Sequence, residues 1–342
     1  MKRLKIVTIG GGTGSFTLLK GLKKYPVDIS AIVSMADDGG STGVLRDELG
    51  VLPPGDVRQC LVALSDSSDV LRRLMNYRFA AGKLKGHNFG NLLLSGMEKI
   101  TGSFSKGVEE VSRILNVKGE VIPVTKDDVS LCMELNGGKI LAGQLEIWKS
   151  DIIEKSGIKN FNLKPDARAN PKAISRLKES DVIIIGPGSH YGSVLPNLLV
   201  RGISRAIVKS KAIVIYNCNL VNKKGQTEKM RLDDYVCSVN NYLGGERINF
   251  AIYNTKKPDK NLVAKYERQK EILVGFLPES VLDRKYKVIL ADLLSSKVSV
   301  FSPHDAISSR RSLIRHDSDK LARVIMEIAD GGRRKSSIKK II

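Results

Sequence analysis

Cysteine is scarce in this sequence. Four occur in 342 residues, at Cys60, Cys132, Cys218 and Cys237. None form a C-x-x-C pair, so the spacing indicates neither a zinc site nor a disulfide framework. A reducing, cytoplasmic location is the simplest interpretation of this cysteine usage.

Long apolar runs are also missing. No run approaches the ~20 residues that a membrane-spanning helix needs. The first apolar run follows a charged start at residues 1–3 and stops at Gly10, which is too short for a signal peptide. We therefore expect no membrane span and no secretion signal.

Aromatic residues make up only 5% of the chain, whereas Lys and Arg number 56 against 36 Asp and Glu, giving a net charge of +20. This excess suits an anionic ligand, a nucleic acid or a non-specifically charged surface. The basic residues are spread along the chain, and so few aromatics provide little stacking surface for single strands. We therefore consider nucleic-acid binding unlikely.

Glycine, by contrast, is concentrated after the first strand. Residues 5–24 are typical of a buried strand, a turn and a helix start, and the turn is Gly10-Gly11-Gly12-Thr13-Gly14. Backbone N–H groups can approach a ligand there, and the positive end of the helix points to the same place, which favours a phosphate or diphosphate. Ser15 stands where a dinucleotide fingerprint has its third glycine, so a turn that binds no ligand stays an alternative. NAD stays an alternative ligand.

A second strand, expected over residues 28–35, leads into Asp37, Asp38 and Ser41. Acidic residues at this point of an α/β fold commonly hold a ribose hydroxyl. The pattern therefore favours a ligand at the glycine turn over a turn that binds nothing.

Two helix starts follow. Asp56 is the expected N-cap of a helix that runs through Leu64. His87, Asn88 and Asn91 precede an apolar helix. Three such side chains offer more hydrogen-bonding groups than a cap needs, so we expect them to face a ligand.

Residues 117–150 alternate between polar and apolar and contain an Asn136-Gly137 turn, which indicates a β-hairpin. We expect an antiparallel insertion between the two halves of a parallel sheet. After it, a strand over 181–185 runs into a second glycine turn, Gly186-Pro187-Gly188-Ser189. This turn is either a second phosphate cradle or a tight connection.

Amides follow the next strand, in Asn217-Cys218-Asn219. The carboxyl edge of a parallel sheet is where α/β proteins bind ligands. Cys218 is more typical of packing than of a nucleophile, because no His is near in sequence. Asp317 is the expected N-cap of the last helix, and Arg315 directly precedes it.

These elements predict an α/β protein with a Rossmann-like, doubly wound, mainly parallel sheet. We expect one domain over residues 1–330, with the β-hairpin insertion at about 117–150. Residues 331–342 read as a basic, disordered tail.

Seven motifs occur in the order of a known family. The chain resembles the YvcK proteins, called gluconeogenesis factors, within the superfamily of CofD-like 2-phospho-L-lactate transferases. The resemblance extends from Lys5 to about Ala329. The motifs are Gly10–Gly14, Ala36–Gly43, Leu52–Arg58, His87–Asn91, Gly186–Ser189, Cys218–Leu220 and Ile314–Asp317.

The resemblance implies a cytoplasmic protein that binds a UDP-sugar such as UDP-N-acetylglucosamine. Such proteins support cell shape and cell-wall synthesis on gluconeogenic carbon sources, without an established catalytic activity. A homo-oligomer and cell-wall synthesis proteins are the further partners it suggests. The alternative is a Mg²⁺-dependent phospholactyl transferase acting on a nucleoside diphosphate-linked donor.

The resemblance also implies roles for single residues. Asp37 and Asp38 would face a metal or ribose and are the candidates for catalysis, and Arg315 would offset diphosphate charge. The remaining ligand-binding candidates are Gly11, Gly12, Thr13, Gly14, Ser41, His87, Asn88, Asn91, Gly188, Ser189, Asn217 and Asn219.

Several positions depart from the family pattern, among them Gly192, where the family often has Thr. His190 stands where the family often has Leu, and Gln144 and Gln226 stand where it often has Glu. A metal or sugar contact through a carboxylate is therefore lost at the two glutamines.

Overall fold

The computed structural model describes residues 3–279, 284–296, 313–331 and 337–342. Its centre is an eight-stranded sheet with the order β11-β10-β9-β8-β7-β1-β2-β3. Neighbouring strands are parallel except for β10 and β11. The predicted Rossmann-like, doubly wound, mainly parallel sheet is confirmed.

The central strands are short apolar runs buried on both faces, as a sheet covered by helices on both sides requires. The strands are β1 (Leu4–Gly10), β2 (Val27–Val33), β3 (Glu120–Pro123), β7 (Val182–Ile185), β8 (Ile213–Asn217), β9 (Phe250–Asn254), β10 (Lys287–Ala291) and β11 (Ile338–Ile341).

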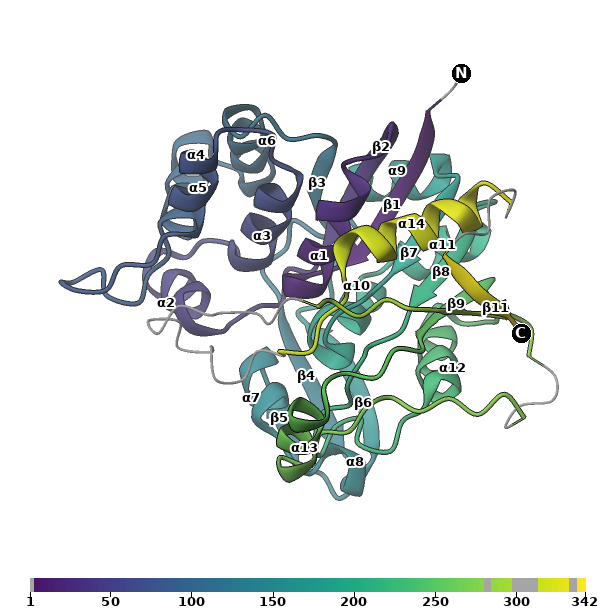
Figure 1. Ribbon diagram of the computed structural model, residues 1–342. Helices are drawn as coiled ribbons and strands as arrows, with labels where there is room; N and C mark the ends of the chain where they lie inside the picture. The colour runs from purple at the N-terminus through teal and green to yellow at the C-terminus, as the bar shows by residue number, and fades with distance from the viewer. Residues whose placement is uncertain (1–2, 280–283, 297–312, 332–336) are drawn as a thin grey trace.

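The helices cover both faces of this sheet (Figure 1). Those before the small sheet are α1 (Gly12–Leu22), α2 (Gly40–Leu49), α3 (Gly55–Leu64), α4 (Asp69–Asn76), α5 (Phe89–Thr101) and α6 (Phe104–Ile114). The later ones are α7 (Gln144–Lys149), α8 (Ile153–Ser156), α9 (Pro171–Glu179), the π-helical turn η1 (His190–Val194), α10 (Leu195–Leu199), α11 (Ile203–Lys209), α12 (Leu232–Leu243), α13 (Lys260–Arg268) and α14 (Ser318–Ala329). None of the helices in the described parts of the chain is long and apolar enough to cross a membrane.

The strand order reverses between β1 and β7. From β1 the chain proceeds to β2 and β3 on one side, whereas β7, β8, β9 and β10 follow one another on the other side. Right-handed crossovers then put the connecting helices of the two halves on opposite faces of the sheet. At such a switch point the connections diverge and leave a crevice beyond the carboxyl ends of the two strands.

A second, three-stranded sheet lies beyond those carboxyl ends, together with α7, α8 and α13 (Figure 1). It consists of β4 (Ser130–Leu135), β5 (Ile140–Ala142) and β6 (Ile158–Lys164) in the order β5-β4-β6. The predicted hairpin is confirmed, since β4 and β5 pair antiparallel. The predicted bounds of the insertion differ, because β3 joins the main sheet beside β2 and β6 completes the small sheet.

The expectation of a disordered tail is wrong for its last residues. β11 pairs antiparallel with β10, and Ile342 exchanges two backbone hydrogen bonds with Val288, at 2.7 and 2.9 Å. An edge strand offers a row of unpaired backbone groups, and apolar residues at the chain end can occupy it despite the neighbouring lysines. The basic residues 333–335 lie outside the described residues.

Candidate functional site

The two glycine turns meet at the switch point. β1 and β7 are parallel neighbours, so both turns leave the same edge of the sheet. A methyl group on Gly14 would overlap the carbonyl oxygen of Pro187, and one on Gly188 would lie 3.7 Å from the carbonyl oxygen of Gly11. The backbones approach so closely that Gly14 has no room for a side chain.

A cleft of about 1010 Å³ opens beside this junction. One wall comes from the start of α1 and from the second glycine turn, and the others come from α7, from residues 219–227, from α13 and from residues 313–316. It brings together six predicted site residues: Thr13, Gly14, Gly188, Ser189, Asn219 and Arg315.

The cleft is suited to an anion. The first turn of α1 contributes Thr13 and Gly14, whose N–H groups lie where a helix has donors without intrahelical partners. Basic side chains outnumber acidic ones in the lining, which contains Lys149, Lys223, Lys224, Lys265 and Arg315 against Asp151 and Glu271. The summed charge attracts a phosphorylated ligand.

Side-chain amides hold the second glycine turn in shape. The N–H of Gly188 donates to Oδ1 of Asn219 at 3.3 Å, and Nε2 of Gln144 donates to the carbonyl of Gly192 at 2.7 Å. Ser189 Oγ accepts from the N–H of Gly192 at 3.2 Å and caps η1. Gln144 is therefore a donor to backbone, a role that an ionised glutamate could not fill.

Gln226 acts in the same way on the wall that carries Trp148. Its Nε2 donates to the carbonyls of Ile147 and Trp148, both at 2.9 Å. Lys223 Nζ donates to the same Trp148 carbonyl at 2.6 Å and lies 4.1 Å from the centre of the indole ring. The carbonyls at the end of α7 are thus satisfied, and the one tryptophan of the chain is fixed in the cleft lining.

In the first glycine turn, Gly11 and Gly12 face a carboxylate instead of the cleft. A methyl group on Gly11 would overlap Oδ2 of Asp56, and one on Gly12 would lie 3.4 Å from its Oδ1. The predicted N-cap role of Asp56 is wrong, because α3 begins at Gly55 with Pro54 as its N-cap. The carboxylate occupies the place at the start of α1 where we expected Gly11 and Gly12 to meet phosphate.

The His87 cluster lies outside the cleft lining. Ser41 Oγ is 3.4 Å from His87 Nδ1 and accepts from Asn91 Nδ2 at 3.4 Å. Asn88 Oδ1 accepts from the N–H of Asn91 at 3.2 Å and caps α5. Buried Arg58 donates its Nε to Asn91 Oδ1 at 2.9 Å. These groups are engaged with one another, so the expectation that they face a ligand of this cleft is not supported.

Asp37 and Asp38 point to different neighbours. Asp37 Oδ1 accepts from the N–H of Gly39 at 3.0 Å, and Asp38 Oδ1 accepts from the N–H of Leu145 at 2.7 Å, in the first turn of α7. Burial raises the pKa of both carboxyl groups above the usual value. Within the described residues no three His, Cys, Asp or Glu side chains are grouped to hold a metal ion. The Mg²⁺ site at this pair stays a prediction, since Mg²⁺ is commonly held by one or two carboxylates together with substrate phosphates.

Two predicted residues end β8 or follow it. Asn217 is fully buried, and neither atom of its amide has a hydrogen-bond partner in the part of the chain that the structure describes. Cys218 is buried as well, and burial raises the pKa of its thiol. A thiol held protonated is a poor nucleophile, which agrees with the packing role expected for Cys218.

Trp148 and His316 are among the cleft residues that sequence reasoning missed. His316 belongs to the Ile314–Asp317 motif, and the motif itself was the available signal. Trp148 gave no local signal, because its position depends on the contacts of Lys223 and Gln226 about 75 residues away.

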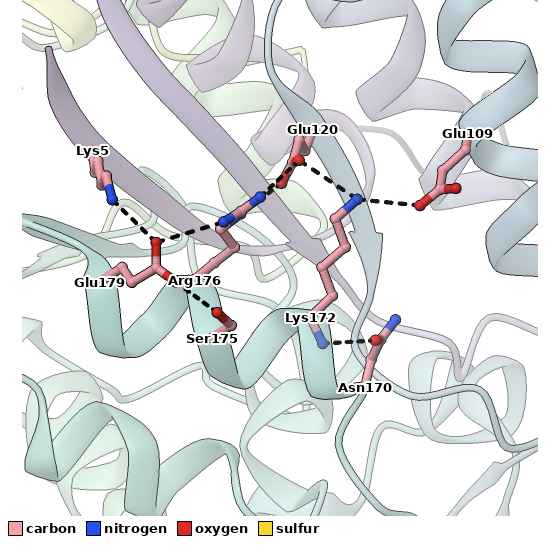
Figure 2. A network of polar contacts seen from close by, with 8 residues as sticks. All are labelled: Lys5, Glu109, Glu120, Asn170, Lys172, Ser175, Arg176 and Glu179. Atoms are coloured by element: carbon pink, nitrogen blue, oxygen red, sulfur yellow. Dashed lines mark hydrogen bonds and ion pairs between the residues drawn. The ribbon is translucent and has the colours of Figure 1, made fainter.

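A smaller hollow, of about 690 Å³, lies at the amino ends of β1 and β2. Figure 2 shows the charge network beside it. Arg176 binds both oxygens of Glu120, at 2.8 and 3.0 Å, and Lys5 binds Glu179 at 3.1 Å. The Arg176 guanidinium lowers the pKa of Glu120. Since these charges are already paired with one another, the network serves to hold α9 against the sheet.

Comparison with known proteins identifies the family. Residues 6–294 match the family described as 2-phospho-L-lactate transferase CofD. The gluconeogenesis factor of Bacillus subtilis is 38% identical over 326 residues, which cover 95% of this chain and 98% of that protein. That of Halalkalibacterium halodurans is 38% identical over 329 residues, covering 96% and 97%. A crystal structure of a UPF0052 family member from Bacillus halodurans has a TM-score of 0.85 and 37% identity, covering 96% of this chain and 100% of that one.

Proposed function

Since this chain belongs to the CofD family and is similar to gluconeogenesis factors over nearly its whole length, we propose that it binds a nucleoside diphosphate sugar of the UDP-N-acetylglucosamine type. The observation that carries the proposal is the junction of Gly14 and Pro187, beside a cleft with excess basic charge at the switch point of the sheet.

In this proposal the diphosphate lies between the start of α1 and Arg315. The N–H groups of Thr13 and Gly14 donate to one phosphate, and the Arg315 guanidinium binds phosphate oxygens as a planar fork. Tyr266 positions the segment that carries Arg315, because its hydroxyl accepts from the N–H groups of Leu313 and Ile314, at 2.5 and 3.4 Å.

We further propose a regulatory binding role in the cytoplasm, in support of cell shape and cell-wall synthesis on gluconeogenic carbon. The names of the relatives support the metabolic context. A binding role agrees with the buried thiol of Cys218, which its raised pKa makes a poor nucleophile, and with the separate hydrogen bonds of Asp37 and Asp38.

Calorimetric titration with UDP-N-acetylglucosamine tests the proposal. We expect saturable heat, and an affinity at least about tenfold weaker in Arg315→Ala, since a hydrogen-bonded charge contributes more than about 1.4 kcal/mol. Arg323→Ala removes the same charge from the exposed face of α14 and should bind as the unaltered chain does. Absence of heat with UDP-N-acetylglucosamine, together with saturable binding of GDP, would overturn the proposal.

The second candidate is a Mg²⁺-dependent phospholactyl transferase, which the CofD family match favours. Its test is turnover of a nucleoside diphosphate-linked donor in the presence of Mg²⁺. If turnover occurs and neither Asp37→Ala nor Asp38→Ala changes its metal dependence, the assignment of those two carboxylates fails.

A further inference from the structure

Trp148 is a half-buried aromatic residue in the lining of the proposed ligand cleft, and it is the single tryptophan of the chain. The other ring side chains among the described residues of that lining are His190, Tyr266 and His316, and all three are buried. Trp148 is therefore the aromatic residue of this lining that keeps the most surface for a ligand.

The helix α7 places this ring beside the second glycine turn. Gln144 and Trp148 are four residues apart in α7, so their side chains lie on the same face of the helix. The Gln144 side chain contacts the segment after that turn, since its Nε2 donates to the carbonyl of Gly192 at 2.7 Å. The indole therefore lies on the face of α7 that is turned toward the second glycine turn, whose Gly188 and Ser189 line the same cleft.

One face of the indole is held by a cation. Lys223 Nζ lies 4.1 Å from the centre of the ring and also donates to the Trp148 carbonyl at 2.6 Å. That carbonyl accepts a second hydrogen bond, from Gln226 Nε2 at 2.9 Å. Because the residue is fixed in this way, the ring loses little conformational freedom when a ligand packs against it.

We propose that Trp148 is the stacking platform for the base of the nucleotide. The face of the indole opposite Lys223 packs against the flat base, while the diphosphate lies between the start of α1 and Arg315. A tryptophan ring is large, rigid and mostly apolar, and every base has a π-face that can stack on it. This inference rests on the proposed function of the cleft, and it adds the residue that recognises the base end of the ligand.

The consequence is discrimination by ligand class. Stacking needs a flat ring and accepts any base, so Trp148 does not choose among nucleotides. Inorganic pyrophosphate and sugar phosphates have no base and gain nothing from the indole. The cleft should therefore select nucleotides over other phosphate compounds of similar charge.

Calorimetric titration of the full chain with UDP, UDP-N-acetylglucosamine and pyrophosphate tests this inference. Trp148→Leu removes the aromatic face but keeps an apolar side chain and the backbone carbonyl that Lys223 and Gln226 bind. Trp148→Phe keeps a smaller aromatic face. Arg315→Ala is the matched comparison, because it removes a phosphate contact of the proposed function and leaves the indole in place.

In Trp148→Leu we expect UDP and UDP-N-acetylglucosamine to bind at least about tenfold more weakly, which is the size of effect that loss of base stacking has, with pyrophosphate changed less than about twofold. Trp148→Phe should recover part of the loss. Arg315→Ala, in contrast, should weaken the binding of all three ligands.

Three results would overturn the inference and leave the proposed function standing. Equal weakening of all three ligands in Trp148→Leu would show that the ring shapes the cleft without binding the base. A loss confined to UDP-N-acetylglucosamine would assign the ring to the sugar, and unchanged binding would assign it to packing. If the unaltered chain binds neither UDP ligand, the proposed function fails and this inference fails with it.

The fluorescence of Trp148 provides a test in the unaltered chain, which has no other tryptophan. A stacked base covers the ring, so saturating UDP should reduce the quenching of Trp148 emission by acrylamide, and pyrophosphate should not. Equal protection by the two ligands, or protection by neither, would contradict the proposal.

Discussion

Gly14 makes the close backbone contact on which the candidate site depends. Because a methyl group there would overlap the carbonyl oxygen of Pro187, we expect Gly14→Ala to lower the free energy of unfolding by about 1–3 kcal/mol, as overpacking does. Ligand binding should weaken with it, since the two turns would separate. Urea denaturation and calorimetry give both quantities.

Gly96→Ala is the matched control. Gly96 lies within α5 with nothing within 4 Å of the added methyl group, so this variant should be more stable by about 0.5–1 kcal/mol. If both variants had equal stability, the close contact between the turns would not exist.

His190 should make stability depend on acid pH. The imidazole is buried between the rings of Tyr191 and Tyr235, with Nε2 2.9 Å from Ser238 Oγ, and burial lowers its pKa from 6.5 to about 3. Below pH 6.5 the His190 side chain binds a proton in the unfolded chain but not in the folded chain. Its contribution to the free energy of unfolding is therefore fully present above pH 6.5 and falls by about 1.4 kcal/mol per pH unit toward pH 3.

His190→Leu removes this contribution. Between pH 6.5 and 5 the variant should lose about 2 kcal/mol less stability than the unaltered chain does. His316 contributes a similar dependence in both proteins, so it cancels in the comparison. Identical pH profiles from urea denaturation would show that His190 is protonated in the folded chain.

The end of α7 depends on the amide of Gln226. Gln226→Glu would remove both bonds to the carbonyls of Ile147 and Trp148 and bury a carboxylate next to them. We expect a loss of about 2–3 kcal/mol and a red shift of Trp148 emission. Gln269→Glu, on an exposed residue after α13, should change stability by less than about 0.5 kcal/mol. A Gln226→Glu variant as stable as this control would rule out the anchoring role.

Local signals predicted the elements that depend on local contacts. The Asn136-Gly137 turn predicted the β4–β5 hairpin, and Asp317 caps α14 as expected. Asp56 was misassigned because its carboxylate lies against a turn more than 40 residues earlier in the chain. Asn91 likewise looked available for a ligand, but its partner Arg58 comes from another helix.

At the scale of the whole molecule, the last strand covers β10, which would otherwise be the edge strand of the sheet. Deleting residues 337–342 removes the pairing of β11 with β10, and we expect a loss of about 1–3 kcal/mol and a greater tendency to aggregate through the exposed edge. The control Lys339→Ser with Lys340→Ser keeps the backbone bonds and should keep the stability. Thermal unfolding of both proteins distinguishes a paired strand from a dispensable tail.

The fold as a whole was predictable because strand, turn and helix alternate in the order that a doubly wound sheet requires. The site was predictable in part. Gly14, Gly188 and Arg315 do meet at one cleft, since carboxyl ends of neighbouring parallel strands share an edge. The sequence could not show that Ser41 and Asn88 lie outside that cleft, because sequence order does not say which helix covers the switch point.

The central claim is that the start of α1 and Arg315 hold the diphosphate of a nucleotide beside the second glycine turn. A crystal structure with UDP-N-acetylglucosamine tests it most directly. The account predicts density for the diphosphate between the start of α1 and Arg315, within hydrogen-bond distance of the N–H groups of Thr13 or Gly14 and of the Arg315 guanidinium. Density for the ligand in the hollow at the amino ends of β1 and β2, or at the His87 cluster, would contradict it.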